Sequence, residues 1–365
     1  MDTNTIYVGI PSMCDPLLEY TIRNCFGNAD HPENITMSVI EQEYPEHALD
    51  WTNPQIAQWK KQIHYKLYHP SDSRGCSWAR SLAQREYTDQ KYYLQIDSHT
   101  GFEKGWDTKY INAMEELMQY HDKPIISCYP ESMQAKDDDP IKNPLPDSFD
   151  PVGVNNTIVM LVGAGDVKKN SKGKLIYQGK AHEEFQNQPD NYIWYFGSDH
   201  LYDAKQPYAH GFGFSGGGTF TLGSFITEVP WDEKTYFSGE EQLAVVKAWT
   251  RGWNVFHRRG GYPIRHYYAP EYKAHNNHWS GTHNLKTEWT KLADLGKARQ
   301  MDVYTGKVQG EHGLGTQRSL KDFAKWSGID LERKLLKPIA FGKENPIYEF
   351  DWTKDPMEYL HGSNS

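Results

Sequence analysis

The chain has 365 residues and a formal net charge of -9, which is enough length for two domains or for one large α/β domain with an appendage. The negative charge excludes a uniformly basic nucleic-acid-binding protein, although a local basic patch remains open. No run of 18 apolar residues is present, and the N-terminal MDTNTIYVGI has neither a basic region nor a long apolar stretch, so we expect no membrane span and no signal peptide.

Four cysteines are scattered along the chain without a CxxC pair, at Cys14, Cys25, Cys76 and Cys128. This pattern predicts free thiols and a reducing compartment, so we expect a cytoplasmic protein.

Residues 1–130 alternate between strand and helix patterns. The expected strands are residues 5–13, 34–42, 92–97 and 124–130, and the expected helices are residues 16–29, 77–87 and 108–121. Strand, helix and strand at this spacing indicate βαβ units and a parallel sheet. We therefore expect residues 1–130 to be an α/β half that binds a nucleotide.

The composition changes after residue 130. Residues 131–209 are rich first in Asp and Pro and then in Lys and Gly, which predicts loops and a hairpin. The run KKNSKGK at 168–174 is either a solvated loop or a contact for phosphates. Residues 210–335 are expected to form a catalytic and acceptor-binding half, with helices over 239–250 and within 314–334, and residues 336–365 a C-terminal tail.

The strand at 92–97 ends in Asp97-Ser98-His99. Residues i and i+2 of a strand point to the same side, so Asp97 and His99 can converge on one cation just beyond the strand. Ligands of open parallel sheets bind at the carboxyl ends of the strands. An oxygen and a nitrogen ligand suit Mn²⁺ or a similar ion better than Ca²⁺. An ordinary strand-end turn is the alternative.

Two ligands do not complete a metal site. His266 lies in YPIRHYY (262–268), which has a strand pattern that places Ile264, His266 and Tyr268 on one face. His257 in NVFHRRGG is a rival third ligand, and either imidazole alone is also typical of a buried structural histidine.

Several further segments carry polar or glycine signals. Glu240 and Glu241 begin a helix, where carboxylates either stabilise the helix dipole or act on a sugar hydroxyl or reacting carbon. Gly216, Gly217 and Gly218 precede an apolar strand, which indicates a turn or a close approach of ligand to backbone. Arg80 is either a surface residue or a phosphate ligand. No Walker loop is present, and no GxGxxG fingerprint follows the first strand.

Four segments, in order, resemble one family. The quoted blocks are YVGIPSMCDPLLEYTIRNCFGNADHPENITMSV, RGCSWARSLAQREYTDQKYYLQIDSHTGFEKGWD, FSGGGTFTLGSFITEVPWDEKTYFSGEEQLAVVKAWTRGWNVFHRRGGYPIRHYY and LGTQRSLKDFAKWSGID. They are similar to metal-dependent glycosyltransferases that add N-acetylglucosamine to hydroxyproline on a ubiquitin-ligase adaptor. The resemblance covers about residues 5–130 and 210–332. Where the family commonly has YRDP, this chain has Met13-Cys14-Asp15-Pro16, so the aspartate is kept and the arginine is absent.

The resemblance implies a GT-A fold, which is an α/β architecture with a mixed, mostly parallel sheet flanked by helices, followed by an acceptor-binding part. It implies that Asp97, His99 and His266 hold Mn²⁺ or Mg²⁺ against the diphosphate of a UDP-sugar. Asp15 and Arg80 would help to hold the nucleotide, and Gly216–Gly218 with Glu240 or Glu241 would face the sugar and the acceptor. Such relatives retain the anomeric configuration.

The resemblance leaves the acceptor open. One expected acceptor is a protein hydroxyl such as that of hydroxyproline. Another is 5-hydroxymethylcytosine in DNA, since relatives also occur in large viruses and phages; this would require base flipping. A third alternative is a non-catalytic sugar-binding module, which the presence of Asp97, His99, His266 and Glu240 disfavours. The transferred sugar stays open.

Overall fold

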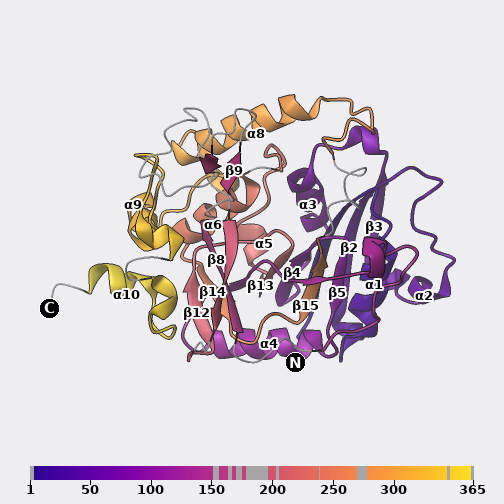
Figure 1. Cartoon of the computed structure of the whole chain (residues 1–365), viewed down its shortest axis with the longest axis horizontal. Helices are drawn as coiled ribbons and strands as arrows, with labels where there is room; N and C mark the ends of the chain where they lie inside the picture. Colours follow the sequence, from indigo (N-terminus) through magenta and orange to yellow (C-terminus); the bar gives the residue numbers. More distant parts are fainter. Residues whose placement is uncertain are drawn as a thin grey trace.

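The computed structural model describes residues 4–150, 156–162, 167–169, 175–177, 196–202, 205–237, 239–268, 278–342 and 346–362. Its centre is an eight-stranded sheet that runs across the molecule (Figure 1). In spatial order its strands are β12 (Tyr208–Gly211), β14 (Asn254–Arg258), β6 (Pro124–Ser127), β13 (Gly218–Leu222), β4 (Tyr92–Ile96), β1 (Ile6–Met13), β2 (Ile35–Gln42) and β3 (Ile63–Tyr68). The strands come from both halves expected from the sequence, so residues 1–130 and 210–335 share one sheet.

The sheet is mixed but mostly parallel, as the sequence predicted. The strands β4, β1, β2 and β3 pair in parallel, and so do β6 and β14. Between them, β13 runs antiparallel to both β4 and β6, and β12 is antiparallel to β14 at the edge. Because β4 and β1 are parallel neighbours, the loops after Ile96 and Met13 leave the same edge of the sheet.

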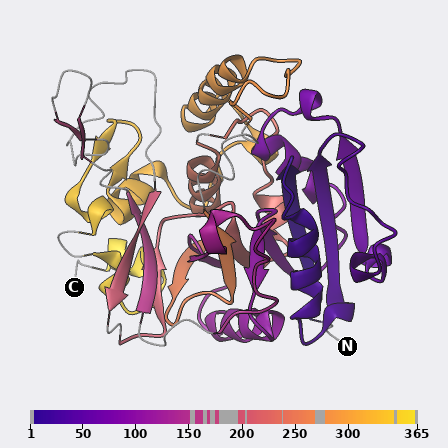
Figure 2. The same cartoon turned by 45° about the vertical axis from the view of Figure 1, so that its right-hand side comes forward.

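Helices cover both faces of the sheet, as alternating strand residues require. On one face, α4 (Trp106–Leu117) packs through Tyr110, whose ring stacks 4.6 Å from Phe220 of β13. The same face receives α1 (Leu18–Gly27), which lies in front of the sheet in Figure 2. On the other face, α3 (Cys76–Gln84) accepts a hydrogen bond at the Ala83 carbonyl from the Tyr7 hydroxyl.

A smaller three-stranded sheet stands beside the central one. Its order is β5 (Thr100–Phe102), β15 (Ile264–Tyr267) and β7 (Glu131–Met133), with β15 antiparallel to β5 and parallel to β7. Arg265 of β15 makes an ion pair of 2.9 Å with Glu103, and the two side chains are 8% and 4% exposed. This buried pair fixes the register between the segment after β4 and a strand that comes much later in the chain.

Strand β3 and helix α8 are among the elements that the sequence did not predict. Strand β3 lies at the sheet edge with mostly exposed or half-buried residues, so it lacks a clear apolar pattern. Helix α8 (Trp289–Tyr304) buries only Gly296, Gln300, Val303 and Tyr304 of its 16 residues and so shows no apolar stripe. The expected strand 124–130 ends earlier, at Ser127, and the expected helix within 314–334 is α9 (Leu320–Ser327), which ends at Gly328 in the left-handed conformation.

The region 131–209 contains more strands than the sequence predicted. Besides β7, strand β8 (Asn156–Val162) pairs antiparallel with β11 (Phe196–Tyr202), and β9 (Val167–Lys169) with β10 (Leu175–Tyr177). Only Lys168 and Lys169 of the basic run KKNSKGK lie within the described residues. The prediction that this run contacts phosphates falls largely outside the described part.

The C-terminal residues pack on the β12 edge of the sheet. Helix α6 (Glu240–Thr250) contacts α9, and α10 (Pro356–His361) follows a buried Trp352. In the part of the chain that is described, no helix has both the length and the apolar composition needed to cross a membrane. All four cysteines are free thiols, as the sequence predicted.

The Arg265–Glu103 pair generates a prediction about stability. Replacing Arg265 with Ala leaves the Glu103 carboxylate buried with Lys109 as its remaining cation, and we expect the free energy of unfolding to fall by about 3 kcal/mol. Chemical denaturation measures this change. The matched control is Arg85→Ala, which removes an ion pair at the surface and should cost at most about 1 kcal/mol. Equal losses in the two variants would contradict the prediction.

Candidate active site

A cavity of about 640 Å³ opens at the carboxyl ends of β1 and β4. It is the position where open parallel sheets bind their ligands. Sequence-predicted residues that line it are Asp15, Arg80, Asp97, His99, Gly217, Glu240, Glu241 and His266. Gly216 and Gly218 are not among the lining residues: Gly218 begins β13, where it pairs with Ile96.

Asp97, His99 and His266 meet in this cavity. One ligand atom from each lies within 4.8 Å of the others. The Nε2 atoms of the two histidines are 2.9 Å apart, and His266 Nε2 is 3.2 Å from Asp97 Oδ2. The backbone holds this arrangement, because Tyr267 N–H donates to the His99 carbonyl at 3.1 Å and β15 pairs with β5.

The sequence predicted that Asp97 and His99 converge because they alternate along a strand, and this reason is wrong. Strand β4 ends at Ile96, so Asp97 and His99 are not alternating strand residues. They lie in the turn between β4 and β5. His99 is directed instead by Asp15, whose Oδ2 lies 2.6 Å from His99 Nδ1 and also accepts a hydrogen bond from the Ser98 hydroxyl.

Asp15 therefore contacts a candidate metal ligand. Burial opposes ionisation of its carboxyl, but the adjacent His99 and the hydrogen bonds from Ser98 and Leu17 N–H outweigh burial and lower the pKa of Asp15 to about 2. A carboxylate that accepts Nδ1–H fixes the histidine tautomer and leaves Nε2 as the ligand atom. Asp15 thus orients His99, and the nucleotide contact that the resemblance implied stays a prediction.

The donor set fits a divalent ion. Two ligands at right angles on an ion with bonds of about 2.1 Å lie about 3.0 Å apart, close to the separations of 2.9 Å and 3.2 Å in this cluster. Two imidazoles and a carboxylate suit Mn²⁺ or a neighbouring transition ion, while Mg²⁺ prefers oxygen ligands. Burial disfavours charge on Asp97, but the hydrogen bond from His266 and the charge of Arg80 hold its pKa well below the usual range.

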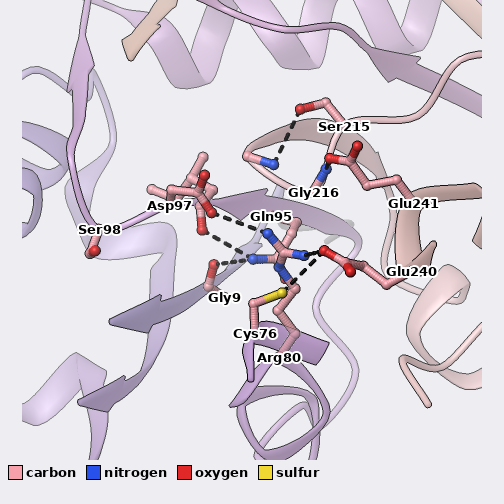
Figure 3. Close-up of polar contacts among 12 residues, drawn as sticks. Gly9, Cys76, Arg80, Gln95, Asp97, Ser98, Ser215, Gly216, Glu240 and Glu241 are labelled. Atoms are coloured by element: carbon pink, nitrogen blue, oxygen red, sulfur yellow. Dashed lines mark hydrogen bonds and ion pairs between the residues drawn. The ribbon is translucent and has the colours of Figure 1, made fainter. Parts of the chain in front are cut away.

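Arg80 links the cluster to Glu240 (Figure 3). Its guanidinium donates to Asp97 Oδ1 at 3.2 Å and to Glu240 Oε1 at 3.1 Å, and it lies over the Trp231 ring. Its side chain is 5% exposed, so the Asp97 carboxylate neutralises a buried cation, and Glu240 accepts a hydrogen bond from it. Arg80 therefore holds the turn that carries Asp97 and the start of α6 in fixed positions.

The two adjacent carboxyls of α6 have different surroundings. Glu241 accepts hydrogen bonds from Gly216 N–H at 2.7 Å and from the Tyr129 hydroxyl at 3.0 Å, so both its oxygens are engaged (Figure 3 shows the Gly216 contact). Glu240 accepts from Arg80 and from the Cys76 thiol at the same oxygen, Oε1. Among the described residues, no side chain pairs with its buried Oε2.

Close packing explains two of the glycines. A Cβ at Gly216 would lie 2.5 Å from the Arg80 guanidinium, and one at Gly217 would lie 2.6 Å from Asp97 Oδ2. The glycine segment is thus required for the approach of the backbone to these charged groups.

The rival ligand His257 lies elsewhere. It is fully buried, its Nδ1 is 2.7 Å from the Ser127 carbonyl oxygen, and its Nε2 accepts from Met160 N–H. Burial is the main cause that lowers the pKa of His257 to about 4. It is a structural histidine, and the choice of His266 over His257 agrees with the geometry.

Sequence reasoning missed other residues that line the cavity. They include Ser12, Gln42, Ser73, Tyr129, Tyr236, Phe237, Tyr268, His278 and Trp279. They come from separate segments, and no spacing between them points to a shared site, so the sequence carried no signal that grouped them.

The cluster generates a prediction about metal binding. Asp97→Ala, His99→Ala and His266→Ala should each weaken Mn²⁺ binding by about a hundredfold or more, because each removes a ligand atom. Calorimetric titration of Mn²⁺ measures the change. His257→Gln is the matched control and should keep the wild-type affinity; a loss confined to the His257 variant would place the third ligand there.

The carboxyl of Glu240 generates a prediction about pH. Burial raises its pKa from 4.5 to about 8, against the opposing charge of Arg80. Between these two values the folded metal-free protein keeps a proton that the unfolded chain has lost, so its free energy of unfolding falls as pH rises through this range. Glu240→Gln removes this contribution. Denaturation of both proteins from pH 5 to pH 8 should show a decline in wild-type stability relative to the variant, and parallel curves would contradict it.

Known proteins show the same architecture. The family described as Glycosyltransferase (GlcNAc) matches residues 46–333, more than half of the chain, including the region 131–209 that the sequence resemblance left out. Among curated proteins, no relative matches the chain.

Two solved structures with low sequence identity match this chain. GalNAc-T7, crystallised with UDP, GalNAc and Mn²⁺, is 13% identical, with a TM-score of 0.50, over 92% of this chain and 58% of that one. S. aureus TarS is 10% identical, with a TM-score of 0.38, over 83% of this chain and 43% of that one. The chain thus spans about half the length of these two proteins. The expected GT-A fold is confirmed, and the extent of the family match shows that the chain belongs to the glycosyltransferase family described as Glycosyltransferase (GlcNAc).

Proposed function

We propose that the protein is a metal-dependent transferase that moves a sugar from a UDP-sugar to a hydroxyl group on a protein. The observation that carries the proposal is the convergence of Asp97, His99 and His266 in the main cavity of a chain from a glycosyltransferase family. The presence of UDP, GalNAc and Mn²⁺ in the structure of GalNAc-T7 supports this choice of donor and ion.

Mn²⁺, or Mg²⁺, would be held by Asp97 Oδ2 and the Nε2 atoms of His99 and His266. When bound, the ion supplies a Lewis acid that neutralises charge on the leaving diphosphate. The protein's own contribution is orientation. Asp15 holds His99 in the tautomer that leaves Nε2 free of a proton, and Arg80 holds the carboxylate of Asp97.

The order of strands suggests how the donor lies. Ser12 is the last residue but one of β1, Gln42 ends β2, and Ser73 follows β3, so these polar residues lie on one side of Asp97. The hydroxyl of Ser12 is buried, and no partner for it lies among the described residues. Glu240 and Gly217 lie on the other side, toward β13. We place the nucleoside beside Ser12 and the sugar beside Glu240.

We propose different roles for the carboxyls of Glu240 and Glu241, because their surroundings differ. Glu240 lines the cavity, and its buried Oε2 has no hydrogen-bond partner among the described residues, so we assign Glu240 to receive a sugar hydroxyl. Glu241 is a positioning residue, because its oxygens hold Gly216 and Tyr129. In the transfer, the acceptor oxygen bonds to the anomeric carbon as the bond from this carbon to UDP breaks, and the hydroxyl proton passes to the departing phosphate. We expect retention of the anomeric configuration.

Among acceptors, a protein hydroxyl such as that of hydroxyproline is favoured over 5-hydroxymethylcytosine in DNA. The single Lys or Arg among the described lining residues is Arg80, which is already paired with two carboxylates. A nucleic-acid acceptor requires basic residues that neutralise phosphates. A non-catalytic sugar-binding module stays the least favoured alternative, since the metal-ligand set is complete.

The proposal predicts UDP release that depends on metal. With Mn²⁺ present, at least one donor from a panel of UDP-sugars should yield UDP, and a chelator should abolish the release. A hydroxyproline peptide should stimulate release, while DNA that carries 5-hydroxymethylcytosine should not. NMR of the product gives its anomeric configuration. Stimulation by DNA alone would overturn the protein acceptor, and no release from any donor would favour the binding module.

A further inference from the structure

Exposed aromatic side chains gather at the mouth of the cavity. Phe237, Tyr268 and Trp279 line it and are 51%, 39% and 40% exposed. Only nine large hydrophobic side chains in the described residues are exposed, so a third of them lie at this one site. Exposed apolar side chains concentrated at one place mark an interaction site, whereas scattered ones are ordinary.

The rings of Phe237 and Trp279 are held in place by contacts with each other and by the residues that precede them in the chain. The Phe237 and Trp279 rings contact each other with centroids 5.0 Å apart. Tyr236 and His278, each one residue earlier in the chain, also contact each other, because the Tyr236 hydroxyl lies 2.6 Å from His278 Nδ1. Tyr236 is 4% exposed and is confined by two glycines, since a Cβ at Gly75 would lie 2.8 Å from its ring and one at Gly296 would lie 3.0 Å from its Cβ. The exposed pair is therefore preorganised for contact.

The third ring, that of Tyr268, lies next to the proposed metal ligand His266. Tyr268 donates its hydroxyl to the Pro130 carbonyl at 2.9 Å, and its ring lies 4.1 Å from the ring of His266. A ligand that rests on these aromatic faces is thus next to a proposed metal ligand, where an acceptor hydroxyl is needed.

The charge of the cavity limits which chemical class of acceptor can bind at its mouth. Its described lining contains the carboxyls of Asp15, Asp97, Glu240 and Glu241 against one guanidinium, that of Arg80. A polyanionic backbone is disfavoured at such a mouth, whereas aromatic-lined grooves bind uncharged polypeptide segments, above all those with prolyl rings.

We propose that Phe237, Trp279 and Tyr268 form the acceptor platform, on which a polypeptide segment docks with an apolar ring beside its hydroxyl group. The inference rests on the proposed function and deepens it, since it names the residues that read the acceptor and the chemistry of the segment that they select.

The test separates binding of the acceptor from binding of the metal ion. Phe237→Ala and Trp279→Ala should each raise the KM for a hydroxyproline peptide about tenfold or more, because each removes a contact face. The affinity for Mn²⁺ should stay within about twofold of wild type, because neither ring belongs to the metal cluster. Trp279→Phe should restore much of the affinity. A peptide with acidic residues beside the hydroxyproline should be a poor acceptor.

The control is Trp289→Ala, which removes a tryptophan that is 37% exposed but does not line the cavity. Its KM for the peptide should equal that of wild type. An unchanged KM in the Phe237 and Trp279 variants, or an equal rise in the Trp289 variant, would overturn the platform while leaving the proposed function intact. Peptide binding is also measured by calorimetry without turnover, so a wild-type protein that binds no peptide overturns the platform even if it consumes a UDP-sugar.

Discussion

The antiparallel pairing of β15 with β5 is the contact on which the active site depends. It places His266 opposite Thr100, one residue after His99, although 167 positions separate the two histidines. The buried pair of Arg265 with Glu103 fixes the register, and a shift by one residue would turn His266 to the opposite face. The central sheet then supplies Asp97 and Asp15 from the parallel neighbours β4 and β1.

A second constraint is the balance of buried charge. Arg80 is surrounded by protein and would be costly to bury alone, but Asp97 and Glu240 lie on either side of it. This single cation makes the position of the turn that carries Asp97 and His99 dependent on the position of helix α6. One oxygen of Glu240 is left buried without a hydrogen-bond partner among the described residues, whereas both oxygens of Glu241 accept hydrogen bonds, from Gly216 N–H and from the Tyr129 hydroxyl. Adjacent residues of one type thereby have different surroundings.

The cavity has a polar interior and an aromatic mouth. The interior holds the metal-ligand cluster and the buried polar side chains that suit a charged nucleotide-sugar. The mouth, with Phe237 and Trp279 supported by Tyr236 and His278, has the chemistry of a surface that binds another molecule. This division matches an enzyme that binds a small donor inside and a larger acceptor outside.

The sequence by itself determined the alternating strands and helices of residues 1–130, because their apolar patterns are local. It also indicated Asp97 and His99 as a candidate ligand pair, with His266 or His257 as a third ligand, and the resemblance selected His266 and added Asp15. It could not detect β3 or α8, whose exposed positions carry no periodic apolar signal. Nor could it separate Glu240 from Glu241, or show that Asp15 contacts His99, since these roles depend on partners distant in the chain. Only the tertiary structure decided them, because hydrogen bonds and charge neutralisation between such partners exist only once the strands and loops that carry them are packed together.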